Sequence, residues 1–299
     1  MSAAAPAADL ALFLRASRDW ADLELERALP RPSGAHAEDA VPPRLAEAMR
    51  YAVFGQGKRL RPALVRLVSR ALGGDDARAA APAVAVECVH TYSLVHDDLP
   101  CMDDDDLRRG RPTCHKVFGE ALAVLAGDAL LTFAFEVLAR EPRAGDLAGA
   151  LARGAGPAGM VGGQQLDLAP PGAPTLALVA EIHARKTAAL LGAAAELGAI
   201  AAGAGEEERD AARDYGRALG LCFQATDDVL DVTGDAATLG KTPGKDARLA
   251  RATLVTLLGL EGARREAERL GAEARAAAQR LGGPERALEL VDAVLRRTT

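Results

Sequence analysis

The stretch TAALLGAAAELGAIAAGAG, residues 187–205, combines Ala, Gly and Leu with a single acidic residue, Glu196. A second apolar stretch, ALAVLAGDALLTFAFEVLA at 121–139, carries Asp128 and Glu136. A carboxylate at the centre of a bilayer costs about 2.5–3.5 kcal/mol, and Ala and Gly contribute little to insertion. We therefore expect two core helices whose small side chains allow close packing, and no integral membrane segment.

Helical periodicity continues along nearly the whole chain, and strict alternation of apolar and polar residues is never sustained. Aromatic residues make up only 3% of the sequence, which argues against an aromatic-rich β-sandwich or barrel. The first helix is expected at 9–29, and the next three are expected to end near Phe54, Gly73 and Asp98. Further helices are expected at about 118–140, 145–153, 175–203, 206–232, 253–281 and 284–297. Loops are expected at 154–163, 170–174 and 234–244. The pattern predicts one all-α domain spanning residues 1–299.

Composition excludes several classes of protein. The 299 residues are 49% hydrophobic, which is enough to bury a large core and excludes disorder. The net charge of −6 argues against a general affinity for nucleic acid or anionic membranes. Four cysteines form no C-x-x-C pair, and no signal peptide is visible, so we expect reduced thiols and a cytoplasmic location.

The densest chemical signal is DDLPCMDDDD at residues 97–106. Carboxylates at this density suit hard cations such as Mg²⁺, which binds a few carboxylates together with water and substrate phosphate. An EF-hand is excluded because the stretch lacks the required glycine and the closing glutamate. By itself, the stretch fits a solvated acidic turn equally well.

A second acidic cluster, DDVLD at residues 227–231, favours the metal-binding interpretation. On a helix, Asp227 and Asp231 share one face and repel each other, and Gln224 lies on the same face. No Lys or Arg occurs between residues 219 and 235. We therefore expect a cation or a ligand to supply the missing positive charge.

Basic residues form separate groups. GKRLRP at 57–62 places three cations at a helix start, where free backbone amides bind anions, although an exposed basic patch would have the same pattern. The basic run 108–111 either neutralises the first acidic cluster or binds phosphate, and Lys186 lies in an apolar helix, where lysine is uncommon unless paired or functional. His90 precedes Asp97 by two helical turns, about 10 Å. Together the clusters predict metal-assisted chemistry on diphosphates, without identifying the organic group.

Six segments together resemble the trans-prenyltransferases that elongate isoprenoid diphosphates, and most of all the bacterial farnesyl diphosphate synthase group. In the family's order they are GKRLRP (57–62), SLVHDDLPCMDDDDLRRGRPTCH (93–115), GGQQLDL (162–168), KTAALL (186–191), FQATDDVLD (223–231) and GKTPGKDA (240–247). The ordered set is far more specific than one aspartate motif. The resemblance implies the all-α isoprenoid synthase fold, a helical bundle around a central cavity lined by both aspartate motifs, and a homodimer.

The resemblance also assigns roles to individual residues. Three Mg²⁺ ions, for which Mn²⁺ is a possible substitute, would bind the allylic diphosphate through Asp97, Asp98, Asp103, Asp227, Asp228 and Asp231. The basic clamp on that diphosphate would be Arg108, Lys186 and Lys241, with Lys245 as a weaker candidate. Isopentenyl diphosphate would bind Lys58, Arg61, His90 and Arg109. Thr187 and Gln224 would lie near the reacting carbons, with their oxygen dipoles toward a carbocation.

The implied reaction condenses isopentenyl diphosphate with dimethylallyl or geranyl diphosphate. Departure of diphosphate leaves an allylic cation, and the metal ions and basic residues stabilise the negative charge that develops on oxygen. The isopentenyl double bond then attacks, a proton is lost, and the departing diphosphate is a plausible base. Closure of the loop 240–245 would exclude water from the cation.

Product length is expected to depend on Tyr92 and Ser93, which lie five and four residues before Asp97. Related bacterial synthases that have an aromatic residue at the first position and a two-residue insertion, here Pro100-Cys101, stop at fifteen carbons. Farnesyl diphosphate is therefore the expected product, and geranylgeranyl diphosphate is the alternative. Tyr92 would also be explained by simple packing against a neighbouring helix.

Three other functions compete with this one. Terpene cyclases share the fold and the first motif but carry a different second metal motif and an aromatic-lined pocket. Non-catalytic subunits of heteromeric prenyl synthases lose one aspartate motif, whereas both are present here. A purely structural acidic protein would not need paired basic sites.

Overall fold

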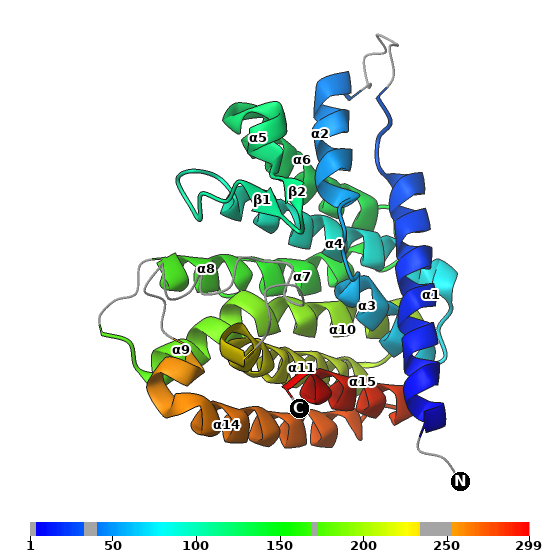
Figure 1. The fold of residues 1–299 in the computed structure, drawn as a ribbon. Coiled ribbons are helices and arrows are strands. Elements are labelled where there is room, and N and C mark those ends of the chain that lie inside the picture. The colour runs from blue at the N-terminus through cyan, green and yellow to red at the C-terminus, as the bar shows by residue number, and fades with distance from the viewer. Residues whose placement is uncertain (1–3, 33–40, 169–172, 234–252, 299) are drawn as a thin grey trace.

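The computed structural model describes residues 4–32, 41–168, 173–233 and 253–298, and these ranges are almost entirely helical (Figure 1). The longer helices are α1 (Ala4–Ala28), α2 (Pro43–Val53), α3 (Leu60–Ala71), α4 (Asp76–Asp97), α6 (Glu120–Leu138), α7 (Ala144–Ala155), α10 (Ala189–Ala202), α11 (Glu206–Thr233), α14 (Leu254–Ala278) and α15 (Glu285–Leu295). The predicted all-α fold is confirmed.

Shorter elements join these helices. They are a two-stranded antiparallel hairpin of β1 (Leu107–Arg108) and β2 (Arg111–Pro112), the helices α5 (Cys114–Phe118), α8 (Met160–Leu168) and α9 (Leu176–Ile182), the π-helix η1 (His183–Ala188) and the 3₁₀ turn η2 (Arg296–Thr298). The helices α9, η1 and α10 follow one another without a break, which agrees with one helix expected over 175–203.

Helix α10 forms the centre of the core, packed between α3, α7 and α11 (Figure 1). All residues from Leu190 to Ile200 are buried, which confirms that 187–205 contains a core helix. A Cβ atom on Gly198 would lie 2.4 Å from the carbonyl oxygen of Val65. Glycine is therefore required for α3 to approach α10 this closely.

Helix α6 fits the expectation of a core helix only in part. One face packs against α4, but Val124 and Leu125 on another face are 39% and 55% exposed. By length and composition α6 is able to cross a membrane, and 33% of its most apolar window is buried in the fold. The buried face consists mainly of Ala123, Ala126, Gly127, Leu130, Ala134 and Leu138.

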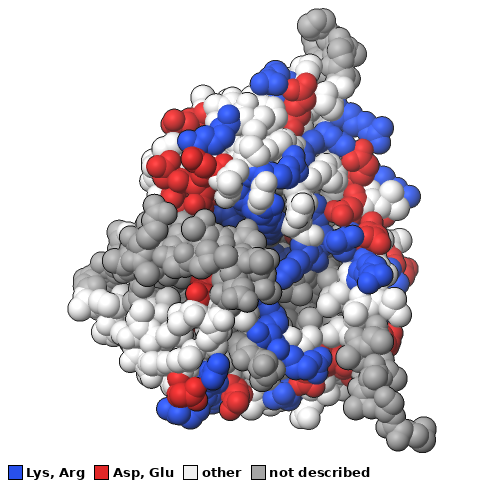
Figure 2. Space-filling view, viewed as in Figure 1, with Lys and Arg blue, Asp and Glu red and all other residues white. Residues whose placement is uncertain are grey.

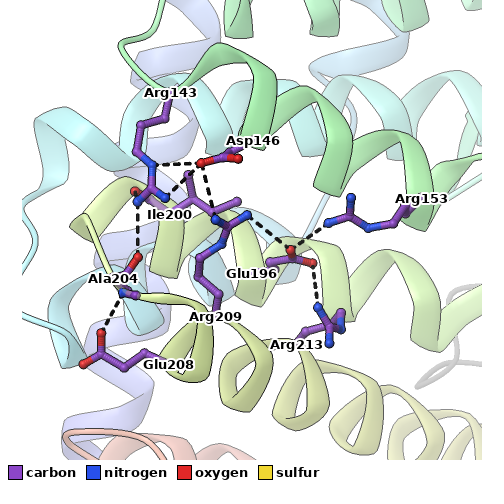
Figure 3. A network of polar contacts seen from close by, with 10 residues as sticks. Arg143, Asp146, Arg153, Glu196, Ile200, Ala204, Glu208, Arg209 and Arg213 are labelled. Carbon is purple, nitrogen blue, oxygen red and sulfur yellow. Dashed lines mark hydrogen bonds and ion pairs between the residues drawn. The ribbon is translucent and has the colours of Figure 1, made fainter.

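A polar network surrounds Glu196, the only charged residue of α10 (Figure 3). Arg153 of α7 donates a 2.8 Å hydrogen bond to its carboxylate, and Arg209 and Arg213 of α11 each lie 3.8 Å from it. Asp146 extends the network by accepting from Arg209 at 3.3 Å. Three guanidinium groups thus compensate a carboxylate that is only 2% exposed and join α7, α10 and α11.

Three short elements were not expected from the sequence. The hairpin and α5 occupy a stretch for which no regular structure was predicted, and α8 begins inside the loop expected at 154–163. Consecutive glycines at 162 and 163 favour a break, but a Cβ on Gly163 would lie 2.2 Å from the backbone nitrogen of Lys186. Packing of α8 against η1, and not local propensity, explains these glycines within a helix.

Candidate active site

The C-terminal end of α4 lies beside α8, and both α8 and α11 pack against η1 (Figure 1). These four elements carry most of the residues that the sequence singled out. Figure 2 shows an acidic group at the loop that follows α4, next to a band of Lys and Arg side chains. Acidic and basic groups therefore lie side by side on one face of the molecule.

Asp97 ends α4 and is partly buried. Its Oδ1 accepts a 2.8 Å hydrogen bond from the side-chain amide of Gln164 on α8. The pKa of Asp97 is raised to about 6, first because burial disfavours the charged form and then because Asp103 and Asp98 lie nearby, against the opposing effect of Lys186 and Arg108. The nearby positive charge of Lys186 and Arg108 thus does not offset the effect of burial and of the neighbouring carboxylates on Asp97.

Asp98 has a different environment from its neighbour. It is 3% exposed, and both of its carboxylate oxygens accept from Nε of Arg108 at 2.8 and 2.9 Å. Arg108 is the last residue of β1, and its guanidinium reaches the end of α4 from there. Of the two roles considered for the basic run 108–111, Arg108 is seen neutralising the first acidic cluster.

Lys186 and Thr187 lie in η1, a π-helical segment of the kind often found at functional sites. The Nζ of Lys186 donates to Asp167 of α8 at 2.6 Å. Thr187 donates from its hydroxyl to the side-chain oxygen of Gln224 on α11 at 2.8 Å. The two residues assigned to the reacting carbons are therefore direct neighbours, although they are far apart in the sequence.

The second aspartate cluster lies on α11, as its spacing predicted. Asp227 forms a 2.9 Å ion pair with Arg297 of η2, whose guanidinium also lies 4.9 Å from the ring centroid of Phe223. The expectation that this cluster has no cationic partner is therefore wrong for Asp227. The sequence window around Asp227 is free of Lys and Arg, but packing of α15 brings an arginine from outside that window.

The remaining acids of the second cluster differ in exposure. Asp228 is buried, accepts from the backbone N–H of Leu254 at 2.8 Å and lies 3.5 Å from Nε2 of His183. Asp231 is exposed. Burial lowers the pKa of His183 to about 4, so its imidazole is neutral near pH 7.

A basic pocket lies along α4, and the charged and titratable residues that line it are Arg59, Arg108, Arg109, Arg111, His90, Glu87 and Asp98. Arg61 lies close to this group, since Glu87 and Arg109 are the charges that act on it most, and its buried Nε has no hydrogen-bond partner among the described residues. The pKa of Arg61 is lowered to about 10, mainly by burial; Glu87 opposes this decrease and Arg109 adds to it. A donor left unsatisfied among cations fits an anion site.

His90 and Lys58 complete this basic region in different ways. The pKa of His90 is lowered well below its usual range, first by burial and then by the nearby Arg61 and Arg109. The imidazole is therefore neutral and able to donate one hydrogen bond to a phosphate. Lys58 is exposed beside the pocket.

Tyr92 is buried on α4 and contacts the ring of His96 edge-on, with 5.7 Å between centroids. The Nε2 of His96 lies 3.1 Å from the carbonyl oxygen of Val124 on α6, and a Cβ on Gly127 would overlap that ring. Ser93 donates its hydroxyl to the carbonyl of His90 at 2.9 Å. Tyr92 thus belongs to the packing between α4 and α6, and its proposed effect on product length stays a prediction.

The donor set fits Mg²⁺ by its chemistry. Within the described ranges, no group of three His, Cys, Asp or Glu side chains is arranged to hold a metal ion alone. Mg²⁺ is usually bound by one or two carboxylates together with substrate phosphate oxygens, so a preformed cage is not required. Asp103 remains close to Asp97, because its backbone N–H donates to the Asp97 carbonyl at 2.8 Å. Lys241 and Lys245 lie outside the described residues.

Comparison with known proteins identifies the family. A family model described as polyprenyl synthetase matches residues 42–290. The chain belongs to the polyprenyl synthetase family. Farnesyl diphosphate synthase of Escherichia coli (strain K12) is 49% identical over 246 residues, which cover 79% of this chain and 82% of that relative. A heterodimeric geranylgeranyl pyrophosphate synthase large subunit from Arabidopsis thaliana is 48% identical over 246 residues, covering 78% of this chain and 66% of that longer relative.

Solved structures of this family share the fold over nearly the whole length. An apo FPP/GFPP synthase from Zymomonas mobilis has a TM-score of 0.82 and 38% identity, covering 97% of this chain and 99% of that chain. A Helicobacter pylori geranyltransferase, complexed with magnesium and isoprenyl diphosphate, has a TM-score of 0.78 and 35% identity, covering 95% and 96%. The resemblance to trans-prenyltransferases is confirmed, and this polyprenyl synthetase is a prenyltransferase.

Several residues at the site of this polyprenyl synthetase were missed by sequence reasoning. Gln164 and Asp167 bind Asp97 and Lys186, and the motif GGQQLDL that contains them was noted without a role. Arg297 and His183 are brought to the second cluster only by tertiary packing. Arg59 stands between two residues assigned to isopentenyl diphosphate but was itself passed over.

Proposed function

We propose that this chain is a Mg²⁺-dependent farnesyl diphosphate synthase that condenses isopentenyl diphosphate with dimethylallyl and then geranyl diphosphate. One observation carries the proposal: α4 presents Asp97 to the acidic cluster and, two turns earlier, His90 to the basic pocket. The two proposed diphosphate sites would therefore lie about 10 Å apart along one helix. A reaction that joins two diphosphate substrates needs this arrangement.

The two sites have distinct roles in the proposed reaction. When Mg²⁺ is bound by the aspartate clusters, it stabilises negative charge on the leaving diphosphate. Lys186, held by Asp167, adds a cation on the same side, and Thr187 with Gln224 places oxygen dipoles where a carbocation would form. Arg109 and the neutral His90, with Arg61 close by, hold the second diphosphate without a metal ion, because four arginines outnumber the two carboxylates in the lining of the basic pocket.

Fifteen carbons is the proposed product length, with Tyr92 as the residue that limits elongation. Its burial against His96 fixes the ring between α4 and α6. The relatives include both farnesyl and geranylgeranyl diphosphate synthases, so geranylgeranyl diphosphate is the second candidate product.

The test is incubation of the purified chain with Mg²⁺, isopentenyl diphosphate and dimethylallyl diphosphate, followed by chromatography of the products. Farnesyl diphosphate is expected from the wild type, and twenty carbons or more from Tyr92→Ala, because a void replaces the ring. Val95→Ala, at another buried position of α4, is the matched control and should leave product length unchanged. A wild type that makes mainly C20, or a Tyr92→Ala product that stays at C15, contradicts the chain-length assignment.

The same experiment separates the competing functions. A terpene cyclase would release hydrocarbon or alcohol products from a single allylic diphosphate. A non-catalytic subunit would neither release diphosphate nor lengthen the chain.

We also propose that the protein is a homodimer that associates through α6. The support is the exposed apolar side chains of Val124 and Leu125 on this helix and of Val117 on α5, which packs against α6. These side chains favour burial against a second copy, since exposed apolar patches mark interaction sites. Light scattering after gel filtration should give twice the chain mass for the wild type and a monomer for Leu125→Asp. A monomeric wild type would contradict the proposal.

A further inference from the structure

Arg59 has a buried guanidinium between two residues of the basic region. It is 4% exposed, whereas Lys58 is exposed and Arg61 is half-buried. Its Nε donates to Asp22 of α1, its Nη1 to Glu87 of α4 and its Nη2 to the carbonyl of Val53 at the end of α2, each at 2.7 Å. One side chain therefore joins three helices beneath the turn 55–59.

The backbone of Arg59 is left-handed, with φ 51° and ψ 39°, at the N-cap of α3. This conformation is unfavourable for a residue with a Cβ atom, because the Cβ approaches the following carbonyl oxygen. Among the described residues only Arg59, Asp104 and Arg109 are non-glycine residues with positive φ, and all three lie in loops beside the site. Such a conformation persists only where surrounding contacts enforce it, and for Arg59 those contacts are its three hydrogen bonds.

Gly57 connects Arg59 to the substrate side of the pocket. A Cβ atom on Gly57 would lie 3.0 Å from Nη1 of Arg59 and 3.0 Å from Nη1 of Arg109. The guanidinium groups of Arg59 and Arg109 therefore both pack against the turn at Gly57. The position of Arg59 limits where the turn and Arg109 can lie.

Glu87 is a carboxylate that interacts with Arg59, Arg61 and Arg109. It is 3% exposed, bonds directly to Arg59, and is the main acidic influence that raises the pKa of Arg61 and of Arg109 against burial. Four arginines and two buried carboxylates, Glu87 and Asp98, line the pocket, so its net charge is positive. The pocket can therefore attract an anion, while the buried carboxylates lower the cost of burying several arginines together.

We infer that Arg59 is a positioning residue of the isopentenyl diphosphate site: its ion pair with Glu87 holds the turn 55–59 so that Lys58, Arg61 and Arg109 face one diphosphate. The inference rests on the proposed function. Arg59 does not itself bind the substrate, because its guanidinium is directed to Asp22, Glu87 and Val53. Its contribution is the shape of the pocket and not its charge.

The test uses Arg66 as a matched control. Arg66 lies on the same helix, is 8% exposed, and bonds to Asp76 at 2.6 and 3.0 Å and to Ser17 of α1 at 3.2 Å. It therefore has a similar structural role, but it is not among the residues that line the pocket. Steady-state kinetics and thermal unfolding would be measured for Arg59→Lys and Arg66→Lys.

Lysine keeps the charge but cannot make the three bonds that fix Arg59. We expect Arg59→Lys to raise the KM for isopentenyl diphosphate about tenfold, the effect of losing about 1.4 kcal/mol of binding, with the KM for geranyl diphosphate and kcat within about twofold. Arg66→Lys should lower the melting temperature to a similar extent and leave both KM values unchanged. An unchanged KM in Arg59→Lys, equal rises for both substrates, or the same pattern in Arg66→Lys would overturn the inference.

Two further measurements test the inference if Arg59→Lys does not fold or if the protein shows no turnover. If Arg59→Lys does not fold, Glu87→Gln removes the charge of the pair with little change in volume, and it should raise the same KM. Binding of inorganic diphosphate in EDTA, measured by calorimetry, needs no turnover and reports the metal-independent pocket. If the wild type makes no prenyl product, the proposed function fails, but weaker binding in Arg59→Lys than in Arg66→Lys would still support the positioning role.

Discussion

Glu196 and Asp97 are both carboxylates held within a helical bundle, but the protein treats them differently. Glu196 receives a 2.8 Å bond from Arg153 and lies near two further arginines (Figure 3). Asp97 accepts a hydrogen bond from the neutral amide of Gln164, and the charges that act on it are mixed, with Lys186 and Arg108 opposed by Asp103 and Asp98. The fold itself supplies the positive charge that neutralises Glu196, whereas it neutralises Asp97 only partly.

The difference separates a structural charge from a functional one. A buried carboxylate that serves stability must have its cationic partners in the fold, because an unpaired charge is costly. A carboxylate that binds a cation from solution must be left short of partners, which appears here as a raised pKa of about 6. The four predictions that follow test this contrast, from the largest expected effect to the smallest.

Asp97→Ala should lower kcat by about three orders of magnitude or more, because stabilisation of the leaving group is worth several kcal/mol. The far-ultraviolet circular dichroism should be unchanged, since the side chain is not part of the core. Asp106→Ala is the control: this residue belongs to the same acidic stretch but is exposed and paired with Lys116 at 2.7 Å. Near-normal turnover in Asp97→Ala, or full activity in EDTA, would remove Asp97 from the metal site.

Glu196→Ala should have the opposite profile, with a large loss of stability and little change in kcat for the folded protein. Losing the charged hydrogen bond from Arg153 and the two nearby arginine contacts should cost about 1.5–3 kcal/mol, because the arginines that remain are partly exposed. Urea unfolding measures this loss. Asp210→Ala removes an exposed partner of Arg213 in the same network and should cost less than about 1 kcal/mol. Equal losses in the two variants would show that Glu196 is not the centre of the network.

The stability of the metal-free protein should depend on the ionisation of Asp97. Because the pKa of Asp97 is raised to about 6 in the folded state, the fold favours the protonated form, and stability falls as pH rises from about 4 to about 6. Asp97→Asn should therefore stabilise the protein in EDTA by about 2–3 kcal/mol at pH 7 and by almost nothing at pH 4. Thermal unfolding at both pH values checks this. A stabilisation that is the same at pH 4 and pH 7 would show that ionisation is not its cause.

The smallest effect is expected at the second cluster, where Arg297 pairs with Asp227. An ion pair at such a partly exposed site is worth about 0.2–1 kcal/mol, which a metal ion must overcome. Arg297→Ala should therefore tighten Mn²⁺ binding, measured by electron paramagnetic resonance without substrate, about twofold to fivefold. Arg280→Ala, which breaks an exposed pair with Asp214 at the same 2.9 Å, should leave Mn²⁺ binding unchanged. Weaker Mn²⁺ binding in Arg297→Ala would mean that Arg297 supports the site instead of competing for it.

Much of this site was predictable because local spacing controls it. The helix that carries Asp227 and Gln224 follows from periodicity, and the helix that carries His90 and Asp97 ends where Pro100 requires it. The contact of Thr187 with Gln224 was indicated only by the family resemblance, since no local pattern joins residues so far apart in the chain. Helix α8 was missed because two glycines suggest a break, whereas close packing against η1 requires them.

The sequence by itself determined the all-α fold, the two aspartate motifs and the separation of acidic from basic groups. These depend on residue types and on periods of three to four residues, which act within one helix. Tertiary structure alone decided the partner of each charge: Arg108 for Asp98, Arg297 for Asp227, Gln164 for Asp97 and Glu87 for Arg59. The physical reason is that electrostatic and hydrogen-bond partners must lie within about 3 Å, and packing sets such distances between segments that the sequence leaves far apart.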